Sequence, residues 1–145
     1  MKPMLVNPDF GLLLVRLMIG FVGVHHGAQK LFGLFGGKGL ADFAAVLEKM
    51  NVPMPKVSAI LAGSAECFGG LLIAMGLFPR LAAIPFAFTM LVAFFHAHGG
   101  KVSGEGNGEY ALVLAVFAIA LFFTGPGRWT VARFLQGKHS SPKTS

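Results

Sequence analysis

Four apolar stretches separated by polar segments dominate the chain. They cover residues 10–32, 57–78, 81–98 and 109–125. A helix needs about 20 residues to cross a bilayer, with a lower limit of roughly 17, so the first two stretches qualify easily and the last two are short. Because lipid offers the peptide group no hydrogen-bond partner, the stretches are expected to be helices. The pattern therefore predicts an all-α fold, an integral membrane four-helix bundle.

The polar link between the first two stretches contains a further helical pattern. Apolar side chains recur at helical spacing from Leu40 to Met50, with Asp42 near the start and Lys49 near the end. This pattern is typical of a short amphipathic helix that lies at the membrane interface. We therefore predict an interfacial helix between transmembrane helices 1 and 2.

Composition agrees with a single membrane domain. Hydrophobic residues make up 54% of the 145 residues and charged residues 12%, whereas a soluble domain carries roughly twice that charged fraction. The net charge of +6 comes from basic residues scattered between the apolar stretches, so no nucleic-acid partner is expected. Residues 1–134 are assigned to one transmembrane domain, and residues 135–145 to a disordered tail. The first stretch contains Arg16 and leads to no small-residue cleavage site, so we expect it to be retained.

The distribution of basic residues predicts the orientation. Four crossings place both termini on one side of the membrane, with six basic residues on that side and five on the other. The positive tail and the tight turn at Arg80 favour a cytoplasmic location for both termini. The predicted location is the plasma membrane, the inner membrane of a bacterium.

Small residues mark faces of the first two helices. Gly20, Gly23 and Gly27 share one face of the first helix, and four glycines punctuate the second: Gly63, Gly69, Gly70 and Gly76. Small residues let membrane helices approach closely. Close packing of these helices is therefore predicted.

Two ionisable residues lie deep inside these same helices. Arg16 is 14 residues from Lys30, and Glu66 is 10 residues from Lys56, which corresponds to depths of roughly 21 and 15 Å. A charge near the bilayer centre needs a partner or water. The similar depths predict a buried Arg16–Glu66 pair, either purely structural or lining a binding cavity.

More polar residues gather towards the side opposite the termini. His26 and Lys30 lie near the end of the first helix, within about 80° of Arg16 on a helical wheel, whereas His25 points away. His96 ends the third helix and Glu109 opens the fourth. We predict that these residues and the buried pair line one intramembrane polar pocket: Arg16, His26, Lys30, Glu66, His96 and Glu109.

Such a pocket could perform several kinds of chemistry. Histidines can relay protons or donate to the carbonyl oxygen of a quinone. Imidazole and carboxylate could also bind a metal, but no HExxH or other fixed ligand spacing is present, so no metal is predicted. The lone Cys67 excludes an internal disulfide and a Cys-rich metal site.

A set of motifs in this order resembles the DoxX family of small four-helix membrane proteins, over roughly residues 9–130. The matching residues are Arg16, His26-Gly27, Lys30-Leu31-Phe32-Gly33, Phe35-Gly36-Gly37, Glu66, Gly69-Gly70, Gly76, Arg80, His96, Glu109, Ala111-Leu112 and Gly125-Pro126-Gly127. The family takes its name from a subunit associated with a thiosulfate:quinone oxidoreductase. Other members are linked to redox stress or to quinone and catechol responses, and distant relatives act as membrane chaperones.

The resemblance implies quinone-linked redox work. The leading hypothesis is a redox-associated subunit of a quinone-linked oxidoreductase, which binds a quinone or similar small molecule and works with a redox partner protein. No covalent or metal cofactor is predicted. The alternatives are a non-enzymatic anchor or assembly factor for a partner protein, a small-solute carrier, which would need a homo-oligomer, and a metalloenzyme.

Overall fold

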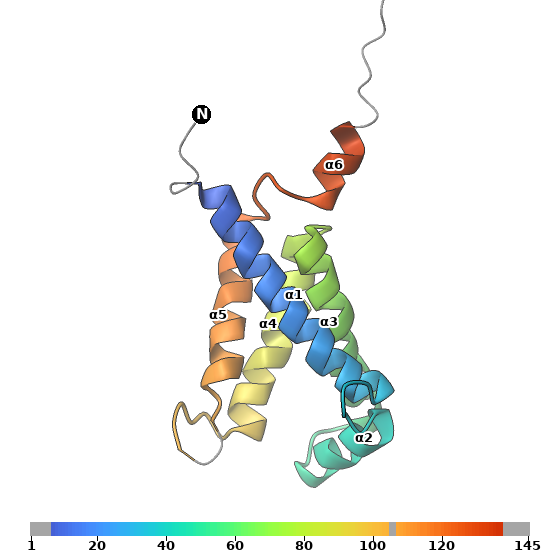
Figure 1. Cartoon of the computed structure of the whole chain (residues 1–145). Helices are drawn as coiled ribbons and strands as arrows, with labels where there is room; N and C mark the ends of the chain where they lie inside the picture. The colour runs from blue at the N-terminus through green and yellow to red at the C-terminus, as the bar shows by residue number, and fades with distance from the viewer. Residues whose placement is uncertain (1–6, 105–106, 138–145) are drawn as a thin grey trace, which may run out of the picture.

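The computed structural model describes residues 7–104 and 107–137, and within these ranges the regular structure is entirely helical (Figure 1). The elements are α1 (Pro8–Phe32), α2 (Leu40–Lys49), α3 (Pro55–Met75), α4 (Pro79–Val92), a π-helical segment η2 (Ala93–Ala97), α5 (Glu109–Thr124) and α6 (Val131–Gly137). This confirms the predicted all-α fold.

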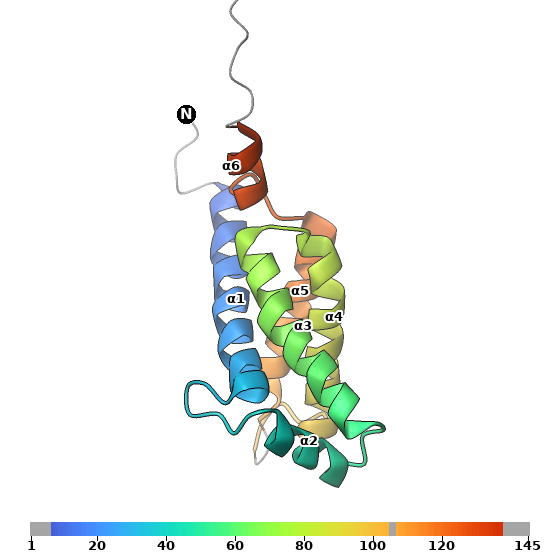
Figure 2. The same ribbon diagram turned by 90° about the vertical axis from the view of Figure 1, so that its right-hand side faces the viewer.

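The long helices α1, α3, α4 and α5 form a bundle (Figures 1 and 2). Among the described residues, three helical stretches are long and apolar enough to cross a membrane: α1, α3 and the continuous α4–η2. The apolar α5 has 16 residues, about 24 Å at 1.5 Å per residue, and it packs mainly on α4. The short α2 lies across the end of the bundle where α1 finishes, as the predicted interfacial helix should, and α6 lies at the opposite end.

Local chemistry explains the helix ends. The side chain of Asn7 accepts a hydrogen bond from the backbone N–H of Asp9 and so caps α1, whose C-terminal cap is Gly33 at φ +68°. Proline occupies the first turn of α1, α3 and α4, where its missing N–H costs nothing. These signals place the long helices close to their predicted positions.

A glycine seam joins α1 to α3. A Cβ added to Gly23 would lie 2.7 Å from the carbonyl oxygen of Glu66 and 3.3 Å from Cα of Gly70, too close for any other residue. Gly27 faces Cys67 and Gly20 faces Ala74 in the same way. The predicted close packing is confirmed, and these contacts set the antiparallel register of the two helices.

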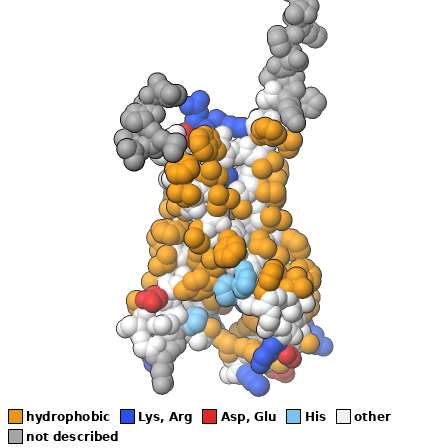
Figure 3. Space-filling model, in the orientation of Figure 1, with side chains coloured by type: hydrophobic (Ala, Val, Ile, Leu, Met, Phe, Trp, Pro, Cys, Tyr) orange, Lys and Arg blue, Asp and Glu red, His pale blue; other side chains and the backbone are white. Residues whose placement is uncertain are grey.

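The outer surface of the bundle is apolar, and its tightly packed core is built largely from small side chains. Among the described residues, the buried core combines many alanines with a few large side chains from four helices: Ile19, Ile73, Phe86, Leu114 and Leu121. Large apolar side chains such as Phe21, Phe88 and Phe123 are more than two-thirds exposed. Figure 3 shows this apolar surface along the bundle, with charged side chains at the two ends. Such a surface fits lipid rather than water.

The first three residues of the predicted disordered tail are helical in the structure. Residues 135–137 are the end of α6, a helix that was not predicted. The Thr130 hydroxyl oxygen accepts a hydrogen bond from the Arg133 backbone N–H at 3.2 Å, which caps the first turn. Seven residues carry too little periodicity to be recognised in the sequence. The rest of the predicted tail, 138–145, lies outside the described residues.

Candidate functional site: a buried ion pair beside a polar pocket

An ion pair joins the last turn of α1 to the middle of α3. The Lys30 ammonium donates to both carboxylate oxygens of Glu66, with Nζ–Oε1 and Nζ–Oε2 distances of 2.5 and 2.7 Å. The Glu66 side chain is 1% exposed, whereas that of Lys30 is 28% exposed. One half of the pair is therefore sealed between helices, and the other half is accessible.

The predicted Arg16–Glu66 pair is wrong, because the carboxylate of Glu66 binds Lys30 instead. The depth estimate assumed that Lys30 and Lys56 lie at the same level. The contacts between Gly27 and Cys67 and along the rest of the seam place Lys30 level with roughly residue 64. The start of α3 therefore extends about nine residues, or ~13 Å, past that level. Glu66 consequently lies at the height of Lys30.

Arg16 belongs to a different site. Its guanidinium donates four hydrogen bonds to backbone carbonyls, two at the end of α3 and two in the segment before α6: Ile73, Ala74, Pro126 and Trp129. Its side chain is 1% exposed. It lies 14 residues before Lys30 on the same helix, about 21 Å away. Arg16 thus ties α1 to two other segments at the end of the bundle where α6 lies.

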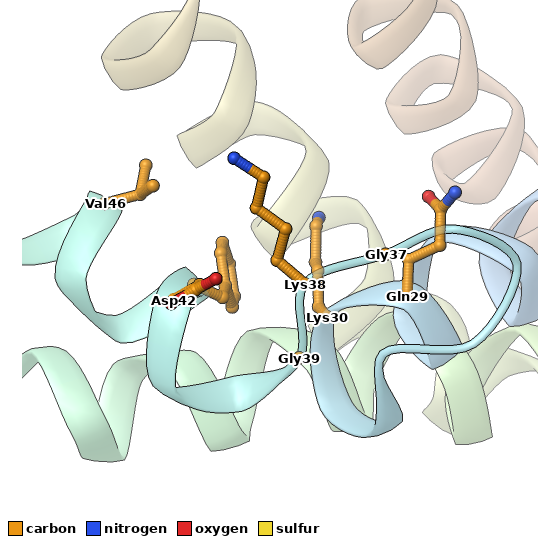
Figure 4. Close-up of a pocket in the computed structure, with 8 residues that line it drawn as sticks. Gln29, Lys30, Gly37, Lys38, Gly39, Asp42 and Val46 are labelled. Carbon is orange, nitrogen blue, oxygen red and sulfur yellow. The ribbon is translucent and has the colours of Figure 1, made fainter.

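A small pocket opens next to Lys30. It has a volume of about 180 Å³ and lies between the end of α1, the loop 33–39 and α2 (Figure 4). Eight residues line it: Gln29, Lys30, Gly37, Lys38, Gly39, Asp42, Phe43 and Val46. The Lys30 Nζ lies 5.1 Å from the centre of the Phe43 ring, a cation–π arrangement. The pocket therefore offers two lysine side chains, a carboxylate, an amide and an aromatic ring.

Histidine and tyrosine rings lie one helical turn from the pair. The His26 ring centre is 5.5 Å from that of Tyr110 on α5 and 5.4 Å from that of His25. His25 in turn stacks on Phe35 of the loop at 4.8 Å. Figure 3 shows histidine side chains around a hollow at this end of the molecule. A titratable group thus lies close to the ion pair without being bonded to it.

The single pocket predicted from six residues is therefore not formed. Lys30 and Glu66 come together, and His26 lies one turn away, but Arg16 lies at the other end of the bundle. His96 and Glu109 are exposed, and no hydrogen bond or ion pair between described residues joins either of them to the pair. Convergence on one end of the bundle does not make side chains meet, because rotation about each helix axis sends some of them outwards.

Sequence reasoning also missed residues that contribute to the site. Phe43 lies within the apolar pattern from Leu40 to Met50, and Tyr110 is the second residue of the fourth apolar stretch, but neither position by itself indicates a site. Their positions relative to Lys30 and His26 depend on how α2 and α5 dock, which a sequence pattern does not encode. Among the described residues, no group of three or more His, Cys, Asp or Glu side chains is placed to hold a metal ion.

The sequence model of the DoxX family matches residues 11–99, a segment that contains Arg16 and both members of the ion pair. The chain belongs to the DoxX family. This confirms the resemblance drawn from the motifs, and it makes the Lys30–Glu66 pair a feature of a DoxX-family membrane protein.

Relatives of this DoxX protein carry names of a general kind. A Bacillus subtilis protein named "Putative oxidoreductase CatD" is 28% identical, over 81% of each chain. The Mycobacterium tuberculosis membrane protein Rv3486 is 31% identical, over 83% of this chain and 78% of its own. The Escherichia coli "Inner membrane protein YphA" is 27% identical, over 86% and 94%. No solved structure matches the chain.

Proposed function

We propose that this DoxX-family protein binds the head of a quinone, or of a similar small molecule with carbonyl oxygens, beside the Lys30–Glu66 pair. The observation that carries the proposal is the asymmetry of the pair. Glu66 is sealed at 1% exposure, while Lys30 is 28% exposed and lines the pocket. A buried carboxylate thus holds an ammonium group at the wall of a cavity.

The chemistry of the pocket suits such a ligand. An ammonium group has three N–H donors, and Lys30 directs two of its contacts at Glu66, so one donor remains for a ligand oxygen. The Phe43 ring supplies an apolar face for a planar head. The pocket of about 180 Å³ holds a head group only, so an isoprenoid tail would lie outside it in lipid.

In this proposal the protein is the membrane subunit of an oxidoreductase, and a partner protein supplies the electrons. Lys30 would stabilise negative charge that develops on the reduced oxygen, and His26, one turn away, would exchange protons with the solvent. The printed name of the Bacillus subtilis relative, an oxidoreductase, supports redox work. The name of the Escherichia coli relative supports an inner-membrane location, and we place the termini in the cytoplasm and the pocket on the opposite side.

Calorimetric titration of the protein in detergent with short-chain menaquinone and ubiquinone analogues tests the proposal. Lys30→Met should weaken binding at least tenfold, about 1.4 kcal/mol, and His26→Ala should weaken it less. Lys49→Met, which removes an exposed lysine on α2 outside the pocket lining, is the matched control and should bind normally.

The same titration separates the proposal from its main rival, a non-enzymatic anchor. A folded Lys30→Met protein that binds the analogues as tightly as the original would remove this site from consideration. If Lys30→Met instead lowers only thermal stability and recovery of a partner protein, the ion pair serves to hold helices together.

A further inference from the structure

A larger groove lies at the other end of the bundle, where α1 and α3 meet the segment that leads into α6. Its volume is about 510 Å³. Leu13, Leu17, Met75, Val131 and Phe134 form much of its wall, and Arg16 is the one charged side chain among the described residues that line it. The groove is thus an apolar surface with a single cation at its base, and it is about 21 Å from Lys30 along α1.

The charge of Arg16 is incompletely balanced within the protein. Its four acceptors are neutral carbonyl oxygens, and no carboxylate of the described residues forms an ion pair with it. The C-terminal end of α3 carries a partial charge equivalent to about half a negative elementary charge. The positive charge of Arg16 therefore acts on the groove at short range, while its side chain is 1% exposed.

The surroundings of the groove are those of a lipid headgroup region. Leu17 and Phe134 are 48% and 66% exposed, so the apolar wall continues into the lipid-facing surface of the bundle. Trp129, the single tryptophan of the chain, lines the groove and is 48% exposed, as is typical of a residue at the interface. Arg128 and Arg133, close by in sequence, are exposed, and Figure 3 shows basic side chains at this end.

We propose that this groove binds one anionic phospholipid. The phosphate lies at the mouth of the groove, drawn there by the exposed Arg128 and Arg133 and by the positive charge of Arg16 at the base of the groove. An acyl chain lies along Leu13, Leu17 and Phe134. Charge complementarity selects an anionic lipid over a zwitterionic one, since arginine and phosphate form strong charge-assisted hydrogen bonds.

Trp129 is a built-in reporter for this site, because its fluorescence is quenched by brominated acyl chains. The full-length protein in neutral detergent is titrated with dibrominated phosphatidylglycerol and, separately, with dibrominated phosphatidylcholine. Phosphatidylglycerol should reach half-maximal quenching at a concentration at least fivefold lower. Equal midpoints for the two lipids would overturn the proposal.

Two variants locate the binding. Arg16→Gln should weaken the preference for phosphatidylglycerol, but it also removes hydrogen bonds that hold the fold. Val131→Phe adds bulk to the groove and leaves residue 16 as arginine, and should raise the phosphatidylglycerol midpoint at least fivefold. Its matched control, Val116→Phe, adds the same bulk at a 52% exposed valine on α5 and should leave the midpoint unchanged. An unchanged midpoint in Val131→Phe would overturn the proposal.

The outcome is independent of the proposed quinone site. Lys30→Met should leave phosphatidylglycerol quenching intact, because Lys30 lies at the opposite end of the bundle. If Lys30→Met raises the phosphatidylglycerol midpoint as much as Val131→Phe does, the quenching does not report a site in this groove and the lipid proposal fails.

Discussion

Helix α1 carries two cations whose environments differ. Arg16 is 1% exposed and is bound by four backbone carbonyls, whereas Lys30 is 28% exposed and shares its charge with the sealed carboxylate of Glu66. A guanidinium can satisfy several carbonyls from separate segments at once, which suits it to holding elements together. An ammonium on a flexible stem, paired on one side and open on the other, can meet a ligand. The two cations therefore differ both in burial and in partners: Arg16 mainly holds segments of the protein together, and Lys30 mainly faces a pocket.

Removing Arg16 should have the largest effect on stability. Arg16→Met leaves four carbonyls without their donor, and we expect a loss of about 3–5 kcal/mol in the free energy of unfolding. Denaturation by SDS in mixed micelles measures it. The control Arg128→Met, at an exposed arginine, should change stability by less than about 0.5 kcal/mol. If both variants lose the same amount, Arg16 does not hold these segments together.

The two halves of the ion pair should respond unequally. Lys30→Met leaves a carboxylate that is 1% exposed without its partner, and should cost about 3 kcal/mol. Glu66→Gln leaves an ammonium that reaches the pocket, and should cost about 1–2 kcal/mol. The same denaturation assay on the double variant should recover at least ~1 kcal/mol relative to the sum of the single losses. Strict additivity would show that the pair is not coupled.

The glycine seam connects the two cation sites, so bulk placed in it should disturb both. Gly23→Ala puts a Cβ 2.7 Å from the Glu66 carbonyl oxygen, and we expect a loss of about 2 kcal/mol. Gly11→Ala, where nothing lies within 4 Å, should instead gain up to ~1 kcal/mol from helix propensity. Thermal unfolding of the two variants compares them directly; a neutral Gly23→Ala would mean that the helices can shift apart at little cost.

Substitution of Asp9 should have the smallest effect among these variants, and it tests which side chain of α1 attaches the segment before α6. Its Oδ1 accepts the backbone N–H of Arg128 at 2.9 Å, a second link from α1 to the segment that Arg16 binds. Asp9→Ala should lower the free energy of unfolding by about 1 kcal/mol, and the exposed Glu48→Ala should not. A loss as large as that of Arg16→Met would show that the carboxylate, and not the guanidinium, is the main attachment.

Much of the fold could be read from the chain, while the site could be read only in part. Runs of apolar residues and the proline and glycine signals at their ends located the long helices and the amphipathic α2. The ion pair was assigned to the wrong cation, since the depth of Glu66 was measured from Lys56 on the assumption that α1 and α3 end at the same level. The contact between Gly23 and Gly70 sets the relative level of α1 and α3 and brings Glu66 to the height of Lys30.

The sequence by itself determined that this protein is a helical membrane protein of the DoxX family with charges inside its bundle. Continuous apolar stretches of about 20 residues favour helices in lipid, because a helix satisfies every backbone hydrogen bond within the segment. Only the tertiary structure decided which charges meet, because partners depend on the relative level and rotation of packed helices. Those are set by close contacts such as that of Gly27 with Cys67, in which a shift of one turn changes every neighbour.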